Sequence, residues 1–352
     1  MRIGVDMAAT AGQKSGLGFY VENVVQALDD LDTEHKMIRI NKVRKNLRTP
    51  SRMLWDQVRL PVNAMAQKLD MLFVPAFSAP RFRKPIVMTA HDIFGVAQPD
   101  KFSGLAKRYW TKTLPQSMYR AERLLCISEY TKQEIMTHLN IDETKLTVVP
   151  LAVSDQFRLV EDAGAIGKHL RDMKVEVPFI LSVGTLEPRK NFERLLEAYA
   201  FSQRQNIKLV LVGKKGWDYH GIFETIRKYH LQNAVILLDY ISDEQLVALY
   251  NACLFFVMPS LYEGFGLPPL EAMQCGAPVA VSQNTSLTEV VGDAGVLFDP
   301  YDVTSIRARL DLLLTDEVMR IEMQRKSVKR AEQFSWKATA RKTMDVFESV
   351  MK

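Results

Sequence analysis

The feature that most constrains this chain is an alternation of short β-branched apolar runs with longer amphipathic stretches, which occurs in two successive series. Strands that alternate with helices in this way form a parallel sheet with helices on both faces. The first series predicts strands at 2–7, 71–74, 86–89, 123–127 and 146–149, and the second at 179–184, 208–213, 234–238, 254–258, 278–281 and 295–298. We therefore predict an α/β fold with two doubly wound, Rossmann-like domains.

The two series are separated by a polar stretch after Pro150 that has no clear strand pattern. A chain of 352 residues is also too long for one comfortable core. We therefore place the boundary in this stretch, with residues 1–165 in the first domain and 166–335 in the second. Ligands of such tandem domains bind in the cleft that faces the carboxyl ends of both sets of strands.

Charge is unevenly distributed along the chain. Residues 1–150 contain 22 Lys and Arg against 15 Asp and Glu, a balance of +7, whereas the whole chain carries +5. Nine of these basic residues lie between Glu34 and Lys68, interleaved with apolar side chains such as Leu54 and Trp55. Two interpretations of this segment stay open: a surface that binds anionic lipid, or an ordinary solvated basic face.

Several classes of protein are disfavoured by simple patterns. The three cysteines are scattered, without the spacing of a disulfide framework or a zinc site, as is usual in a reducing compartment. The chain begins without the pattern of a secretion signal, and no apolar run reaches the roughly 18 to 20 residues of a membrane span. We expect a cytoplasmic protein. If the basic segment binds lipid, the protein would also be peripheral on the inner face of the plasma membrane.

The most specific motif is PSLYEGFGLPPLEAMQCGAPVA, which directly follows the predicted strand 254–258. Proline is favoured in the first turn of a helix because its missing N–H would have no partner there, so a helix should begin close to Leu267. The backbone amides of Phe265, Gly266 and Leu267 would then be free to bind a diphosphate or sugar hydroxyls. The alternative is a capped strand-to-helix turn with two surface acids.

Those two acids are Glu263 and Glu271, eight residues apart. Glu263 precedes the predicted helix, where its carboxylate could accept hydrogen bonds from sugar hydroxyls. Glu271, one turn into the helix, could accept two hydrogen bonds from a ribose.

A second motif, SVGTLEPRKN, follows the predicted strand 179–184 and delivers Arg189 and Lys190 to a loop that starts at Gly184. We predict that Gly184 also contacts the donor. Two fixed cations there would stabilise the charge that grows on a departing diphosphate. The chain has no Asp-X-Asp pattern to hold a divalent metal against a diphosphate, so we predict a site without metal or other cofactor. The alternative is a solvated cation pair at the start of a helix.

Two weaker signals lie in the first half. SGLGFY, from Ser15 to Tyr20, carries Gly16 and Gly18, which would let the backbone approach a phosphate or the transferred sugar. It lacks the full spacing of a dinucleotide-binding loop, which disfavours NAD. His91 follows the strand 86–89 and could place its imidazole or carbonyl beside the reacting carbon. The competing interpretations are a metal-binding His-Asp pair of a phosphohydrolase and a structural histidine.

Taken together, these motifs resemble glycosyltransferase family 4, the retaining enzymes with the two-domain GT-B fold, over nearly the whole chain. EGFGLPPLE resembles the family's Glu-(seven residues)-Glu motif, and VGTLEPRKN its diphosphate loop. SGLGFY resembles its glycine-rich acceptor-side loop, AHD its donor-side histidine, and CISEYTKQEI and VVPLAV the segments that close its first domain. Ser15 stands where many members have glycine.

The resemblance implies a role for each matching residue. Arg189 and Lys190 would bind the diphosphate and Glu271 the ribose, while Glu263 and the amides of 265–267 would orient the sugar and phosphate. Gly16 and His91 would reach in from the first domain. Ile241 would meet the nucleobase through its backbone, and a final helix at about 336–352 would cross back onto the first domain. In this family the leaving diphosphate itself is thought to accept the proton of the acceptor, so no enzymic nucleophile is needed.

The bacterial surface-polysaccharide members resemble this chain most. We therefore predict transfer of a hexose, with mannose from GDP-mannose as the best hypothesis, to a lipid-linked saccharide or polysaccharide acceptor, and no nucleic-acid partner. The alternatives are a UDP-sugar-dependent transferase for glucose, galactose or an N-acetylhexosamine, a non-catalytic GT-B scaffold that binds a partner transferase, and a nucleotide-sugar epimerase.

Overall fold

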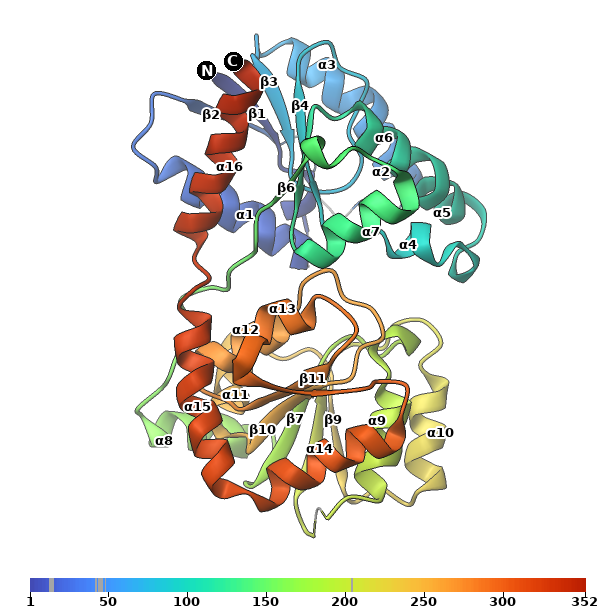
Figure 1. The fold of residues 1–352 in the computed structure, drawn as a ribbon, viewed down its shortest axis with the longest axis vertical. Coiled ribbons are helices and arrows are strands. Elements are labelled where there is room, and N and C mark those ends of the chain that lie inside the picture. Colours follow the sequence, from blue (N-terminus) through green and yellow to red (C-terminus); the bar gives the residue numbers. More distant parts are fainter. Residues whose placement is uncertain (13–15, 42, 44–46, 48, 204) are drawn as a thin grey trace. The chain divides into compact units, whose positions relative to one another are not determined.

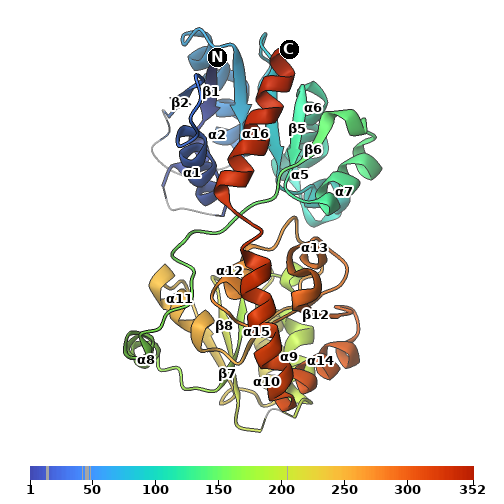
Figure 2. The same ribbon diagram turned by 60° about the vertical axis from the view of Figure 1, so that its left-hand side comes forward.

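A computed structural model describes residues 1–12, 16–41, 43, 47, 49–203 and 205–352, and the chain divides into two compact units. The first unit comprises Met1–Ala152 together with Ser335–Lys352, and the second comprises Val153–Phe334. Each unit has its own six-stranded parallel sheet flanked by helices (Figures 1 and 2). The prediction of two doubly wound α/β domains is confirmed.

The sheet of the first unit has the order β2-β1-β3-β4-β5-β6. Its strands are β1 (Arg2–Asp6), β2 (Lys36–Ile40), β3 (Met71–Val74), β4 (Ile86–Ala90), β5 (Arg123–Cys126) and β6 (Leu146–Val148). Its helices are α1 (Gly16–Asp29), α2 (Thr49–Leu54), α3 (Leu60–Met65), α4 (Phe94–Ala97), α5 (Gly104–Arg108), α6 (Leu114–Arg120), α7 (Glu129–Leu139) and α16 (Trp336–Met351). π-Helical turns at Trp55–Arg59 and Tyr109–Thr113 join α2 to α3 and α5 to α6.

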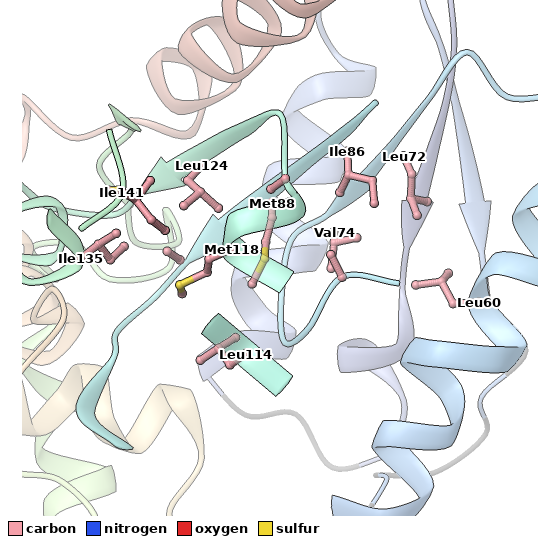
Figure 3. Packing of buried hydrophobic residues seen from close by; sticks show 14 of the residues in the cluster. Leu60, Leu72, Val74, Ile86, Met88, Leu114, Met118, Leu124, Ile135 and Ile141 are labelled. Carbon is pink, nitrogen blue, oxygen red and sulfur yellow. The ribbon is translucent and has the colours of Figure 1, made fainter. Parts of the chain in front are cut away.

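The core of the first unit lies on both faces of this sheet. Residues Leu72 and Val74 of β3 point to the face that α3 and α6 cover, where Leu60 and Met118 pack against them (Figure 3). Phe73 points to the opposite face, because side chains alternate along a strand. Its ring packs against that of Phe347, with the ring centroids 5.1 Å apart. Helices α1 and α16 lie side by side on that face (Figures 1 and 2).

The sheet of the second unit has the order β12-β11-β10-β7-β8-β9. Its strands are β7 (Phe179–Val183), β8 (Lys208–Val212), β9 (Val235–Leu238), β10 (Phe255–Met258), β11 (Val279–Ser282) and β12 (Gly295–Phe298). Its helices are α8 (Ala163–Asp172), α9 (Phe192–Ala200), α10 (His220–Lys228), α11 (Asp243–Ala252), α12 (Leu267–Gln274), α13 (Leu287–Val291), α14 (Val303–Thr315) and α15 (Glu317–Ala331). The strand order reverses between β7 and β10, and a ligand crevice is expected beyond the carboxyl ends of such a pair.

The boundary between the units lies at Ala152, thirteen residues before the predicted one at 165. Residues 153–165 belong to the second unit because polar contacts hold them to α11. The amide of Val160 donates to Asn251 Oδ1 at 2.9 Å, and the side-chain amide of Gln156 donates to Asp243 at 2.8 Å. The sequence alone predicts a polar linker here because the hydrogen-bond partners of this stretch lie some ninety residues away along the chain.

The basic segment 34–68 is partly buried. Trp55, Leu60 and Arg52 are in the interior, whereas Leu54 and Val58 are about half exposed. Lys42, Arg44, Lys45 and Arg48, which supply much of its charge, lie outside the described residues. Among the helices that the structure describes, none combines the length and the apolarity that a bilayer span requires.

Candidate functional site

The candidate site lies at the point of the second sheet where strand order reverses. One loop follows β7 and ends in the short turn Pro188–Lys190, and the other follows β10 and leads into α12. Backbone and side-chain hydrogen bonds join the two loops. The amide of Leu261 donates to the carbonyl of Arg189 at 2.8 Å, and the side-chain amide of Asn191 donates to the carbonyl of Pro259 at 3.0 Å.

Both predicted cations meet Glu263 in this crevice. Lys190 Nζ lies 2.6 Å from Glu263 Oε1, and Arg189 Nη1 lies 3.1 Å from Glu263 Oε2. Arg189 also pairs with Glu187, at 2.8 Å between Nη2 and Oε1. Lys190 and Glu263 are each 8% exposed, so their charges are largely removed from water. Sequence motifs 73 residues apart thus supply one compact cluster of ionised groups.

Burial and charge act in opposite directions on this cluster. Burial alone would raise the pKa of Glu263, but the adjacent Lys190 and Arg189 outweigh it and hold that pKa below its usual range. Burial also lowers the pKa of Lys190, which Glu263 opposes and Arg189 reinforces. The separation of 2.6 Å between Nζ and Oε1 is that of a charge-assisted hydrogen bond, so we regard the pair as ionic.

Gly184 provides the space for Lys190. A Cβ atom on Gly184 would lie 3.3 Å from Cδ and Cε of the lysine side chain, a tight contact in a buried site. The glycine therefore seats the aliphatic part of Lys190. Its predicted contact with the donor stays a prediction.

Helix α12 begins at Leu267 with a proline in its first turn, where the sequence predicts it. The preceding Gly266 has φ of +121°, and a Cβ atom there would lie 2.5 Å from Leu287 Cδ2, so both conformation and space require glycine. The hydroxyl of Ser286 lies 2.8 Å and 2.7 Å from the carbonyl oxygens of Glu263 and Phe265. These contacts fix the loop just before the free amides of the first helical turn.

Glu271 projects toward α11. It accepts a hydrogen bond from the Tyr250 hydroxyl at 2.9 Å. Burial raises the pKa of Glu271 to about 7, although the bond from Tyr250 lowers it, and Asp243 adds to the increase. Ile241, the predicted nucleobase contact, is half-buried immediately before α11. Both residues predicted to bind the nucleoside are therefore associated with this helix.

The remaining predicted residues belong to the first unit. Gly16 is the exposed first residue of α1, while Ser15 lies outside the described residues. Gly18 is buried, and a Cβ atom there would lie 2.6 Å from the carbonyl oxygen of Ala9, so close packing of α1 accounts for this glycine. The predicted approach of its backbone to a phosphate or the transferred sugar stays a prediction.

His91 follows β4 and is neutral at physiological pH. Burial lowers its pKa to about 4. Its Nε2 atom lies 2.8 Å from the carbonyl oxygen of Pro75, and because that oxygen only accepts, Nε2 carries the proton and Nδ1 a lone pair. The ring also packs edge-on against Tyr20 of α1, with centroids 4.7 Å apart. An uncharged His91 can accept a hydrogen bond at Nδ1 but cannot act as a cationic acid.

Comparison with known proteins identifies the family. The model for Glycosyltransferase Family 4 matches residues 15–157, and that for Glycosyl transferases group 1 matches residues 171–334. The chain is 34% identical over 277 residues to the O-antigen chain mannosyltransferase B of Escherichia coli, which covers 78% of this chain and 73% of that protein. The chain belongs to glycosyltransferase family 4.

Other similarities agree with this assignment. The chain is 33% identical over 274 residues to the serotype-specific mannosyltransferase WbdA of Escherichia coli, which covers 75% of this chain but only 33% of that longer protein. The structure of a sucrose-phosphate synthase from Thermosynechococcus elongatus superimposes with a TM-score of 0.80 at 18% identity, over 100% of this chain and 99% of that one. The family 4 chain is thus a hexosyltransferase with the GT-B fold.

Two residues that support the family 4 site were missed in the sequence. Asn191 has φ of +59°, and its side-chain amide donates to the carbonyls of Pro259 and Pro300, while its Oδ1 accepts from Arg194. An asparagine directly after the cation pair is a signal for such a left-handed turn. Ser286, which fixes the loop before α12, has no comparable local signal.

The described ranges contain no group of three or more His, Cys, Asp or Glu side chains arranged to hold a metal ion. Independence of metals and other cofactors therefore remains a prediction.

Proposed function

We propose that this family 4 enzyme transfers mannose from GDP-mannose, with retention of anomeric configuration, to a lipid-linked saccharide or polysaccharide in the synthesis of a cell-surface glycan. The observation that carries the proposal is the buried cluster in which Arg189, Lys190 and Glu263 meet at the start of α12. The choice of mannose rests on the relatives whose printed names are mannosyltransferases.

The cluster is suited to a leaving diphosphate. Each oxygen of Glu263 is paired with one cation. A diphosphate at the amides of 265–267 would compete for those cations, which frees Glu263 to accept hydrogen bonds from sugar hydroxyls. As the bond to phosphate breaks, charge grows on the leaving oxygen, and Arg189 and Lys190 stabilise it more in the transition state than in the ground state.

In this proposal the other predicted residues orient the substrates. Glu271 accepts hydrogen bonds from the ribose, and the backbone at Ile241 meets the nucleobase. Gly16 and the neutral His91 of the first unit contact the transferred sugar. The bond between the anomeric carbon and the phosphate oxygen breaks while the oxygen of the acceptor hydroxyl bonds to that carbon. The leaving phosphate oxygen takes the proton of the acceptor hydroxyl. Glu263 therefore orients the sugar and forms no covalent bond.

A panel of nucleotide sugars tests the donor. The protein is incubated with GDP-mannose, UDP-glucose, UDP-galactose and UDP-N-acetylglucosamine, each with and without a lipid-linked acceptor, and released nucleotide is measured. Acceptor-dependent release of GDP from GDP-mannose is expected. Turnover of a UDP-sugar but not of GDP-mannose would overturn the donor assignment, and a changed sugar nucleotide without acceptor would indicate an epimerase.

An Arg189→Ala variant separates an enzyme from a scaffold. The Arg189 side chain is 23% exposed and Lys190 still compensates Glu263, so the variant should fold with a reduced melting temperature, which is measured beside transfer. Transfer should fall by about 10²-fold or more, because one of two groups on the leaving oxygen is lost. Equal transfer by the variant and the parent protein would favour a scaffold.

We also propose that the first unit binds an anionic membrane surface. Leu54, Val58, Val62 and Met65 of the α2–α3 run are 48%, 51%, 58% and 62% exposed, at a spacing that puts them on one face. Retention on vesicles of anionic lipid at low salt is expected, and it should weaken in a Val58→Ser, Val62→Ser variant. Equal retention on neutral vesicles, or none on anionic ones, would contradict this.

A further inference from the structure

The first unit contains a cavity of about 360 Å³ beyond the carboxyl end of β4, and among its lining residues the proposed function gives a role only to His91. Its wall includes Arg52, Phe77, His91, Asp92, Tyr109 and Trp110, all within this unit. The volume lies in the usual range for a pocket that binds a small molecule or one unit of a larger one, about 300–1,000 Å³.

Arg52 is the unusual group in this wall. It is 5% exposed, and its guanidinium carbon lies 3.8 Å from the centroid of the Phe77 ring. Within the described part of the chain, its Nε and Nη1 atoms have no hydrogen-bond acceptor, although Nη1 lies 3.5 Å from a carboxylate oxygen of Asp56. Buried donors without acceptors are rare because leaving them unpaired destabilises the fold. A ligand in the cavity would supply the missing acceptors.

The charge around Arg52 is already balanced. Asp56 pairs with it and accepts a hydrogen bond from Ser78 at 2.6 Å. Asp6, also buried, accepts from the indole of Trp55 at 3.0 Å and lies close enough to interact with Arg52. With two carboxyl groups beside one guanidinium, the cavity offers hydrogen-bond donors without a surplus of positive charge. It therefore favours a neutral ligand that bears hydroxyl groups over a phosphate or a carboxylate.

Aromatic rings form much of the remaining wall. Tyr109 and Trp110 lie edge to face, with centroids 5.8 Å apart. Trp110 is held in place by Gly95 of α4, since a Cβ atom on that glycine would lie only 2.2 Å from the indole Cγ. His91, neutral and with a lone pair on Nδ1, adds an acceptor at the same wall. Apolar ring faces next to a few fixed polar groups are the features that recognise a sugar ring, whose faces carry C–H groups and whose edge carries hydroxyls.

We infer that this cavity binds one neutral pyranose unit of the acceptor glycan, with Trp110 against a face of the sugar ring and Arg52 donating to its hydroxyls. The inference rests on the proposed function for its acceptor, but the binding it describes requires neither donor nor transfer. Arg52 and Trp110 would thus select the acceptor, whereas the cluster around Lys190 serves the donor.

Binding of simple glycosides to the full chain tests this without catalysis. Methyl α-glycosides of mannose, glucose, galactose and N-acetylglucosamine are titrated while tryptophan fluorescence is followed, with the methyl glycoside of glucuronic acid as the anionic probe. At least one neutral glycoside should give a saturable change. Trp110→Ala and Arg52→Met should each weaken that binding at least tenfold, as measured by ligand-observed NMR. Trp217→Phe, at an exposed tryptophan outside the cavity, should not.

Further variants protect the test against a simple folding defect. Arg52→Met with Asp56→Asn removes both charges of the pair, so Asp56 is not left as an unpaired carboxylate, and Asp6 keeps its hydrogen bonds from Trp55 and the amide of Ala8. Gly95→Ala pushes the Trp110 ring from its position without changing any residue of the wall named above. Both should keep GDP binding, measured by calorimetry, while losing the glycoside at least tenfold.

The outcomes are distinguishable. The inference is overturned if no neutral glycoside binds, if the glucuronide binds better, or if these variants bind the sugar as well as the parent chain. Saturable, Trp110-dependent binding in a protein that turns over no nucleotide sugar would instead leave the inference standing and defeat the proposed transfer.

Discussion

Replacing Lys190 with methionine separates the structural role of the buried ion cluster from its proposed role in transfer. Methionine keeps the apolar stem that packs over Gly184 but removes the ammonium 2.6 Å from Glu263. The carboxylate of Glu263, 8% exposed, then keeps only Arg189 at 3.1 Å. The variant therefore probes the loss of one of two cations that share a single buried anion.

The size of the effect follows from that geometry. Breaking a buried pair by removing one partner costs about 3–5 kcal/mol. Because Arg189 remains, we expect the lower end, about 3 kcal/mol, which corresponds to a decrease of about 6–12 °C in the melting temperature for a unit of this size. Transfer should fall by about 10²–10³-fold, as when one preorganised group that stabilises a leaving anion is lost.

Two comparison variants make the assay specific. Lys326→Met removes an exposed lysine that pairs with Glu322 on α15, and it should leave the melting temperature unchanged. Lys190→Met combined with Glu263→Gln leaves no unpaired buried charge, so most of the stability should return while transfer stays low. Melting is followed by calorimetry, and transfer by nucleotide release at saturating donor.

The reasoning is refuted if Lys190→Met melts with the parent protein, since the ion pair would then contribute nothing. It is equally refuted if the double variant regains transfer together with stability, because Lys190 would then act only through the fold.

Three further predictions concern the same unit. Gly266→Ala should destabilise the second unit by about 1–3 kcal/mol in urea unfolding, because φ is +121° and the new Cβ atom would lie 2.5 Å from Leu287 Cδ2. Gly221→Ala should cost less, because its Cβ atom would meet only the side chain of Glu193. The native state keeps the proton of Glu271 up to about pH 7, whereas the unfolded chain loses it near pH 4.5, so the free energy of unfolding should fall as pH rises between these values. Glu271→Gln should make this fall shallower. An unchanged slope would contradict the raised pKa of Glu271. Asn191→Ala should cost about 1–3 kcal/mol more than Asn191→Gly in thermal unfolding, since only glycine relieves φ of +59°.

Features with local causes could be predicted from the sequence. The buried strands are continuous apolar runs, and the start of α12 follows from prolines and glycines that lie within a few residues of it. The convergence of Arg189, Lys190 and Glu263 also follows, because loops after neighbouring parallel strands meet at one edge of the sheet.

Features that depend on distant partners could not. Strand β2 is half-exposed at the edge of its sheet and has no apolar run, so it was not predicted. Arg52 and Trp55 lie in a basic segment that resembles a surface, yet both are buried: the indole of Trp55 donates to Asp6, and Arg52 forms an ion pair with Asp56. Pairing between Trp55 and Asp6, which are 49 positions apart, leaves no trace in local periodicity.

The position of α16 has a consequence for biosynthesis. Phe347 is fully buried against Phe73, and Thr339 donates to the carbonyl of Pro150, so residues near the end of the chain complete the unit that its beginning starts. On the ribosome, residues 1–152 must wait, with the part of their sheet that α16 covers still exposed, until some 180 more have been translated. The second unit is continuous in sequence and can fold during this time. A chaperone that binds exposed aromatic side chains therefore has longer to act on the first unit, where Phe73 waits for Phe347, than on the second.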